Sequence, residues 1–215
     1  IKASGTAMRF LTAYLCLSQG EHIITGTERM KHRPIKILVD ALRYLGADID
    51  YIGNEDYPPL RIRGRELEGG QLVIPGNVSS QYVSALLMVA PILTKGLDLK
   101  LTGEIVSRPY IDLTLHIMHE FGVAAEWTNF DTISVKPQQY TRRTYTIEND
   151  WTAASYWYEV LALQEDLDEE VVLSGLKDGS RQGDAAVRYI FSLLGIKTNF
   201  ARKDTEGLTD ATLTR

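Results

Sequence analysis

The order of apolar and polar positions along this chain repeats three times. Each copy begins with a helical stretch that is apolar on most of its faces, as expected of a buried helix. These stretches are residues 6–17, 80–93 and 152–163. After each stretch the sequence predicts a strand, at residues 22–25, 97–101 and 171–173, and then a turn made of one small residue and a glycine.

A second, amphipathic helix follows in every copy. Its apolar residues recur at the spacing of one helix face. They are Ile35, Leu38, Val39, Leu42 and Leu45 in the first copy, Ile111, Leu115, Met118 and Phe121 in the second, and Val187, Ile190, Phe191 and Leu194 in the third. Gly46, Gly122 and Gly195 then stand where a helix end favours a left-handed residue. Further strands are predicted at residues 48–52, 60–62, 124–127, 132–135 and 197–200.

These elements define the fold class. The repeated order is strand–helix–strand–helix–strand–strand, and such a period indicates copies of one supersecondary unit. Apolar helices beside amphipathic helices and strands predict an α/β (α+β) architecture with helices inside and sheets outside, closed by repetition. Residues 64–71 join the first two copies. The polar residues 137–146 join the second and third copies, and they are the better candidate for a domain boundary.

The composition narrows the class of protein. Hydrophobic residues make up 44% and charged residues 24%, which is ordinary for a globular chain of 215 residues. The net charge of −5 argues against a broad nucleic-acid surface but permits a local basic cluster. No signal peptide is visible, and no apolar run reaches the ~18 residues that a membrane span needs. We therefore expect a cytoplasmic protein with no membrane partner.

Cysteine and histidine give no sign of a metal site. The single cysteine, Cys16, excludes an internal disulfide framework and a multi-cysteine zinc site. Because it lies in an apolar helical stretch, we expect an inert core residue. His116 and His119 share a helix face, but neither an HxxxH spacing nor a carboxylate triad accompanies them. We expect no bound metal.

The start of the second apolar helix carries Ser79, Ser80 and Gln81. A helix start offers unpaired N–H groups and a partial positive charge. With serine hydroxyls added, it makes a natural phosphate cradle. The alternative is plain N-capping by Ser79 or Ser80.

The start of the first apolar helix carries Gly5, Thr6 and Arg9. A glycine lets a ligand approach the backbone closely. Thr6 can cap the helix, and Arg9 lies one turn further along. The alternative is an ordinary cap with an arginine that extends to solvent.

The segment from Arg29 to Pro34 places four potentially cationic residues within five positions of an acidic chain. Arginine binds carboxylate or phosphate through two parallel hydrogen bonds, and Pro34 suits the first position of a helix. Ser107 and Tyr110 stand at the equivalent place in the second copy. The alternative is a solvated turn. If the three helix starts converge, they form a site for a small ligand that carries phosphate and carboxylate.

In order and spacing these motifs resemble the 5-enolpyruvylshikimate-3-phosphate synthase family of 3-phosphoshikimate 1-carboxyvinyltransferases. The stretches that carry the resemblance are 5–9 (GTAMR), 29–35 (RMKHRPI), 79–82 (SSQY), 107–112 (SRPYID) and 182–184 (QGD). They extend over essentially the whole chain. Because members of this family are about twice as long, the resemblance implies an internal fragment.

The resemblance also implies a fold and a domain organisation. The family has an inside-out α/β barrel of βαβαββ repeats, the enolpyruvyl transferase-like fold, and its substrates bind between two domains. Residues 1–146 would form most of one domain, and residues 147–215 would begin the other. The full-length protein would be a monomer.

The implied reaction transfers the enolpyruvyl group of phosphoenolpyruvate to the 5-hydroxyl of shikimate 3-phosphate and releases phosphate, without a metal or an organic cofactor. The matching positions imply two sets of binding residues. The set for shikimate 3-phosphate is Ser79, Ser80, Gln81, Ser107 and Tyr110. The set for phosphoenolpyruvate is Gly5, Thr6, Arg33 and Gln81. Arg9 would support its helix.

The chain departs from the family pattern in several places. Ala3 and Phe10 replace a frequent asparagine and a frequent proline. The family's proton-transfer residues and much of its binding charge have no match in these 215 residues. We therefore expect no catalytic residue in this chain and no turnover by the chain alone.

Two other functions compete with this one. A UDP-N-acetylglucosamine enolpyruvyl transferase would have a similar fold, but it uses a loop cysteine that residues 27–32 lack. The other candidate, from a different class, is a non-catalytic repeat scaffold or binding module.

Overall fold

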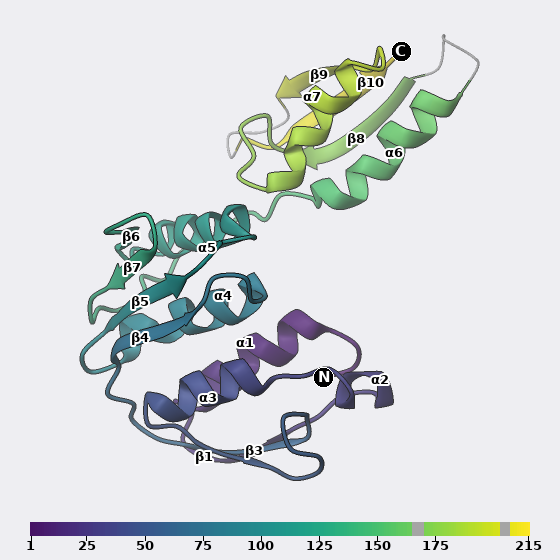
Figure 1. The fold of residues 1–215 in the computed structure, drawn as a ribbon. Coiled ribbons are helices and arrows are strands. Elements are labelled where there is room, and N and C mark those ends of the chain that lie inside the picture. Colours follow the sequence, from purple (N-terminus) through teal and green to yellow (C-terminus); the bar gives the residue numbers. More distant parts are fainter. Residues whose placement is uncertain (165–169, 203–206) are drawn as a thin grey trace. The chain divides into compact units, whose positions relative to one another are not determined.

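The computed structural model describes residues 1–164, 170–202 and 207–215. The chain divides between Arg142 and Arg143 into two compact units (Figure 1). Unit 1 is Ile1–Arg142 and unit 2 is Arg143–Arg215. Each unit has its own hydrophobic core, so each is described separately.

Unit 1 contains two copies of the repeat. The first copy consists of α1 (Gly5–Leu15), β1 (Gly20–Ile24), α2 (Glu28–Lys31), α3 (Lys36–Tyr44), β2 (Asp48–Tyr51) and β3 (Leu60–Gly64). The second consists of β4 (Gly70–Pro75), α4 (Ser80–Val89), a short 3-10 helix (Ala90–Ile92), β5 (Leu97–Thr102), α5 (Arg108–Glu120), β6 (Ala125–Trp127) and β7 (Thr132–Val135). The second copy therefore shows the full predicted order of strand, helix, strand, helix, strand, strand.

Unit 2 contains the third copy. Its described elements are α6 (Trp151–Leu163), β8 (Glu170–Leu176), a 3-10 helix (Gly183–Ala186), α7 (Val187–Ser192), β9 (Lys197–Arg202) and β10 (Thr209–Thr214). The sequence did not predict β10, and it also missed β4 and the single-turn helix α2. Strands β4 and β10 have six residues each, in which buried and more exposed positions alternate, and α2 is a single turn.

The sheets confirm that the copies are equivalent. Their strand orders are β1-β3-β2, β4-β5-β7-β6 and β8-β10-β9, so the same antiparallel three-strand arrangement recurs three times. Only β4 is added, in parallel with β5. The mixed α/β class and the repeat were therefore predicted correctly. Among the described residues the three sheets stay separate, so the closed barrel of the expectation is not found in this chain.

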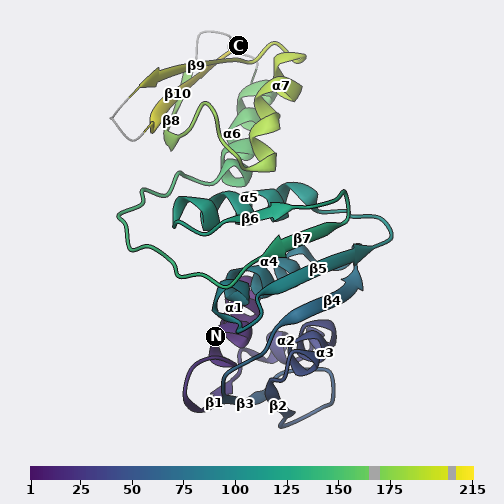
Figure 2. The ribbon, with the colours of Figure 1, turned by 90° about the vertical axis from the view of Figure 1, so that its left-hand side faces the viewer.

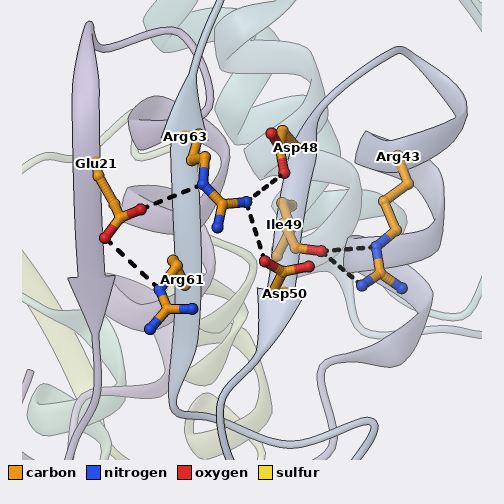
Figure 3. Close-up of polar contacts among 7 residues, drawn as sticks. All are labelled: Glu21, Arg43, Asp48, Ile49, Asp50, Arg61 and Arg63. Atoms are coloured by element: carbon orange, nitrogen blue, oxygen red, sulfur yellow. Dashed lines mark hydrogen bonds and ion pairs between the residues drawn. The ribbon is translucent and has the colours of Figure 1, made fainter.

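The first sheet shows how sequence alternation separates its two faces. Buried Ile62 and Leu60 of β3 face the helices, while Arg61 and Arg63 face outward. Arg63 binds Glu21 of β1 and Asp48 and Asp50 of β2, with N–O distances of 2.9–3.2 Å (Figure 3). Arg61 lies 3.6 Å from the same Glu21. A one-residue slip would exchange the two faces, so this pattern fixes the register.

Helix α4 is the centre of unit 1. Six consecutive residues from Tyr82 to Leu87 are buried, as the sequence predicted for a helix that is apolar on most faces. It packs against α1, α3 and α5 (Figure 2). The amphipathic stripe of α3 is also confirmed, since every apolar residue predicted for it is buried. The starts of α1, α4 and α5 are consequently held by one core.

Unit 2 departs from the predicted burial. Helix α6 was expected to be buried, but Tyr156 and Trp157 are exposed, and so are Ile190 and Leu194 of the predicted stripe after α6. The reason is the number of packing partners. Within unit 2, α6 and α7 pack on each other and on one three-stranded sheet, whereas α4 has a helix on several sides. The three predicted glycine caps are confirmed, since Gly46, Gly122 and Gly195 all have positive φ.

We predict that Gly64→Ala destabilises unit 1. The end of β3 runs so close to the turn after α1 that a Cβ on Gly64 would overlap the carbonyl of Ser18. Backbone atoms cannot move aside as a side chain can, so we expect a loss of about 3 kcal/mol in the free energy of unfolding. Urea unfolding followed by circular dichroism measures it. The control is Gly53→Ala, whose Cβ would make an ordinary 3.5 Å contact, and an equal loss in both variants would contradict the account.

We also predict that the thiol of Cys16 is unreactive in the folded chain. Cys16 is fully buried and donates to the carbonyl of Thr12. Burial raises the pKa of the Cys16 thiol from 9.0 to about 12. Between these values the unfolded chain loses the proton that the folded chain keeps, so this group lowers stability as the pH rises above 9. A thiol reagent at pH 8 should label Cys16 only after unfolding, and rapid labelling of the native chain would contradict its burial.

Candidate functional site

Helix α1 begins one residue earlier than Thr6. Ser4 is its N-cap and accepts a hydrogen bond from the N–H of Ala7 at 3.2 Å. The prediction that Thr6 caps the helix is therefore wrong, because Ser4 already fills that position. The Thr6 hydroxyl instead accepts a hydrogen bond of 2.8 Å from the side-chain amide of Gln81. This bond joins the start of α1 to the start of α4.

At the start of α4 the two serines have different roles. Ser79 is the N-cap, and its hydroxyl accepts a long hydrogen bond of 3.4 Å from the N–H of Gln81. The capping alternative is therefore confirmed for Ser79. Ser80 is the first helical residue, and its hydroxyl has no partner among the described residues. One serine is thus free to donate to a ligand.

Arg9 is a buried residue of the helix interior. Only 5% of its surface is exposed, so the alternative of an arginine that extends to solvent is wrong. It donates from Nη1 to the carbonyl of Gly5 at 2.8 Å, and its guanidinium lies 5.5 Å from the ring centroid of Tyr82. Its Nε is buried and has no hydrogen-bond partner in the described structure.

Arg33 lies before a helix rather than at its first turn. Helix α3 begins at Lys36, so the prediction that Pro34 occupies its first position is wrong. Two long-range bonds hold this segment out of the helix. Ile35, which is buried, donates its N–H to the carbonyl of Asp56 at 2.9 Å, and the carbonyl of Pro34 accepts from the Tyr82 hydroxyl at 2.8 Å.

The two arginines meet above Gly5. A Cβ built on Gly5 would lie 2.5 Å from Nη1 of Arg9 and 2.5 Å from Nη1 of Arg33. The two nitrogens are therefore no farther apart than twice that distance. Neither guanidinium forms an ion pair within the described residues. Like charges this close repel each other, so the place is electrostatically suited to an anion. Only glycine leaves it open.

The basic residues near Arg33 are partly occupied. Lys31 forms an ion pair of 2.6 Å with Glu28, and the Nδ1 atom of His32 lies 2.8 Å from the carbonyl of Glu28. Both contacts are local, between residues of the single-turn helix α2 and its C-cap. Arg29 and Arg33 are both exposed, and Arg33 is the one whose side chain approaches Gly5.

The second Arg-Pro motif has a different use. Ser107 is the N-cap position of α5 but makes no capping bond through its side chain. Arg108 lies 3.9 Å above the Trp127 ring and donates to the carbonyl of Phe130. These two contacts hold the start of α5 against the β6–β7 hairpin. Tyr110, which is half-exposed, turns toward the cavity that follows.

A cavity of about 630 Å³ lies among α1, α4 and α5. Its lining brings together four of the predicted site residues: Thr6, Ser80, Gln81 and Tyr110. The predicted residues Gly5, Arg33, Ser79 and Ser107 are not part of its lining, although each lies at or beside one of these helix starts. The arrangement thus has a positively charged subsite above Gly5 and a neighbouring cavity, and the Gln81–Thr6 bond lies beside both.

Sequence reasoning missed the apolar part of this cavity. Its other lining residues are mostly apolar and include Phe10, Met88, Leu113, Ile117 and Phe121. The proximity of Arg9 to Arg33 was also missed, because the residues lie in different elements.

None of the described helices combines the length and apolarity that crossing a bilayer requires.

Comparisons with known proteins identify the family. The family model described as EPSP synthase (3-phosphoshikimate 1-carboxyvinyltransferase) matches residues 1–212. A 3-phosphoshikimate 1-carboxyvinyltransferase of Bacteroides fragilis is 58% identical over 200 residues, which cover 93% of this chain and 48% of the relative. One of Photobacterium profundum is 44% identical over 194 residues, or 89% of this chain and 45% of the relative. The chain belongs to the EPSP synthase family, and it spans about half the length of the curated relatives it matches.

Solved structures support the same fold. EPSP synthase from Acinetobacter baumannii has a TM-score of 0.77 at 21% identity, over 100% of this chain and 46% of that one. The enolpyruvyl transferase NikO from Streptomyces tendae has a TM-score of 0.61 at 14% identity, over 95% and 46%. At these identities the likeness concerns the fold alone. The chain therefore has the fold of enolpyruvyl transferases.

Proposed function

We propose that this chain is the substrate-binding part of an enzyme that makes 5-enolpyruvylshikimate 3-phosphate. The reaction transfers the enolpyruvyl group of phosphoenolpyruvate to the 5-hydroxyl of shikimate 3-phosphate and releases phosphate. The observation that carries the proposal is the pair of guanidiniums above Gly5, beside the Gln81–Thr6 bond. Membership in the family suggests these substrates. The two guanidiniums support the proposal because they can bind the negative charges of the substrates.

In this proposal phosphoenolpyruvate lies above Gly5. Arg33 is exposed and has no carboxylate partner in the described structure, so its guanidinium is available for a bidentate bond to phosphate or carboxylate. Arg9 adds positive charge from below while remaining bonded to Gly5. Gln81 reaches Thr6 from α4 and would stand between the two substrates.

Shikimate 3-phosphate would bind along the starts of α4 and α5. The free hydroxyl of Ser80 and the N–H groups of the first turn of α4 are suitable donors to its phosphate. Ser79 and Ser107 are the cap positions of the same two helices, and the ring of Tyr110 borders the cavity. The hydroxylated cyclohexene ring of the substrate would then lie in that cavity beside Thr6, Ser80 and Gln81.

The proposal assigns no proton transfer to this chain. Moving a proton requires a positioned acid or base, and the described residues that line the cavity include no Asp, Glu, His or Lys. We assign residues 1–146 to one enzyme domain and residues 147–215 to the start of the other, which fits a division between Arg142 and Arg143. The monomeric state and the cytoplasmic location of the complete enzyme remain predictions.

One observation speaks against the enolpyruvyl transferase that acts on a UDP-sugar. That enzyme uses a cysteine in the loop before its Arg-Pro motif. The one cysteine of this chain is Cys16, which is buried at the end of α1. Nothing in residues 27–32 replaces it.

We predict that Arg33→Met weakens phosphoenolpyruvate binding by about tenfold or more, because a charge-assisted bond to the ligand is lost. The matched control is Arg29→Met, which removes an exposed arginine from α2 a few residues away. Calorimetric titration of the purified chain measures both. Equal effects of the two substitutions would mean that only net charge matters and would contradict the assignment of Arg33. No heat with either substrate in any form of the chain would favour the scaffold alternative.

We predict that Gly5→Ala also weakens phosphoenolpyruvate binding by about tenfold but leaves shikimate 3-phosphate binding within about twofold. The added methyl group would occupy the place where the two guanidiniums meet. Titration of each substrate separately makes the comparison. Equal weakening for both substrates would show that the change disturbs α1 as a whole and not the subsite above Gly5.

A further inference from the structure

We propose that Tyr82 is a positioning residue that holds Arg33 above Gly5. The inference rests on the proposed function, since it concerns the same subsite. Tyr82 is buried in the first turn of α4, directly after Gln81. Its hydroxyl donates to the carbonyl of Pro34, the residue that follows Arg33, at 2.8 Å. Tyr82 touches the segment that carries the arginine and is not part of the cavity lining.

Arg33 needs such support because its own side chain has none. Among the described residues its guanidinium forms no ion pair and donates no hydrogen bond to another group. The second Arg-Pro motif shows the contrast, because Arg108 is fixed by the Trp127 ring and the carbonyl of Phe130. The position of Arg33 must therefore come from its backbone.

The backbone of this segment is held at three points. The N–H of Arg33 donates to the carbonyl of Met30 at 3.1 Å, and the N–H of Ile35 donates to the carbonyl of Asp56 at 2.9 Å. Both bonds stay within the first repeat. The bond from Tyr82 to Pro34 is the one that ties this segment to α4, whose start carries Ser80 and Gln81. It therefore links the segment of Arg33 to the helix start that carries Ser80 and Gln81.

Tyr82 also contacts Arg9, the other arginine of the pair. The guanidinium of Arg9 lies 5.5 Å from the Tyr82 ring centroid, within the range of a cation–π contact. The ring therefore lies beneath one guanidinium while the hydroxyl holds the segment of the other. Because the two charges repel each other above Gly5, an exposed Arg33 on a free segment would move away. The Tyr82 hydroxyl opposes that movement.

The test is Tyr82→Phe, which removes the hydroxyl and leaves the ring under Arg9. The matched control is Tyr158→Phe in unit 2, which removes a buried tyrosine hydroxyl that lies 2.9 Å from the Thr198 hydroxyl. Hydrogen exchange of the Arg33 and Ile35 amides is measured in both variants of the full chain. Phosphoenolpyruvate and shikimate 3-phosphate are then titrated separately by calorimetry.

We expect faster exchange at Arg33 and Ile35 in Tyr82→Phe, with phosphoenolpyruvate affinity reduced about fivefold and shikimate 3-phosphate affinity unchanged. The control should alter none of these. Unchanged exchange overturns the positioning role, and so does an equal loss of affinity for both substrates, which would mean a general loss of structure. If the unsubstituted chain binds no phosphoenolpyruvate, the proposed function fails, and the exchange rates alone then decide the role of Tyr82.

Discussion

The burial of α4 is the constraint on which the rest of unit 1 depends. Its residues from Tyr82 to Leu87 are apolar or small on every side, so the helix is stable only when other helices surround it. Helices α1, α3 and α5 do so. Because the surrounding helices start near the start of α4, the same packing that stabilises the core gathers the polar residues of these helix starts. The hydrophobic core and the candidate site therefore depend on the same packing of α4.

Charge gives this arrangement its chemistry. The chain is acidic overall, and the outward face of the first sheet balances its arginines with carboxylates. Above Gly5 the opposite holds, because Arg9 and Arg33 meet without an acidic partner in the described structure. Unpaired positive charge beside a helix start is costly without a ligand and favourable with an anionic one. This local imbalance distinguishes the subsite from the ordinary ion pairs elsewhere on the unit.

Much of the fold could be predicted from the sequence because local patterns determine it. The apolar stripe of α3, the buried α4 and the glycines that end the helices all follow from neighbouring residues. The predictions that were wrong concern features that depend on residues distant in the sequence. Pro34 lies outside α3 because Tyr82 and Asp56 bind its segment, and no local pattern reveals those partners. The burial predicted for α6 was wrong for a related reason, since burial requires packing partners that the described part of unit 2 does not contain. The sequence motifs placed the candidate site residues at helix starts, but only the structure brought Arg9 beside Arg33.

The central claim is that the starts of α1 and α4, with the Arg33 segment, form one anion site. Nuclear magnetic resonance of the isotope-labelled chain during titration with phosphoenolpyruvate tests it most directly. The account predicts that the amide signals of Gly5, Thr6 and Gln81 shift together with that of Arg33, and that they saturate at one ligand concentration. Shifts confined to other parts of the chain, or different saturation for α1 and α4, would contradict it.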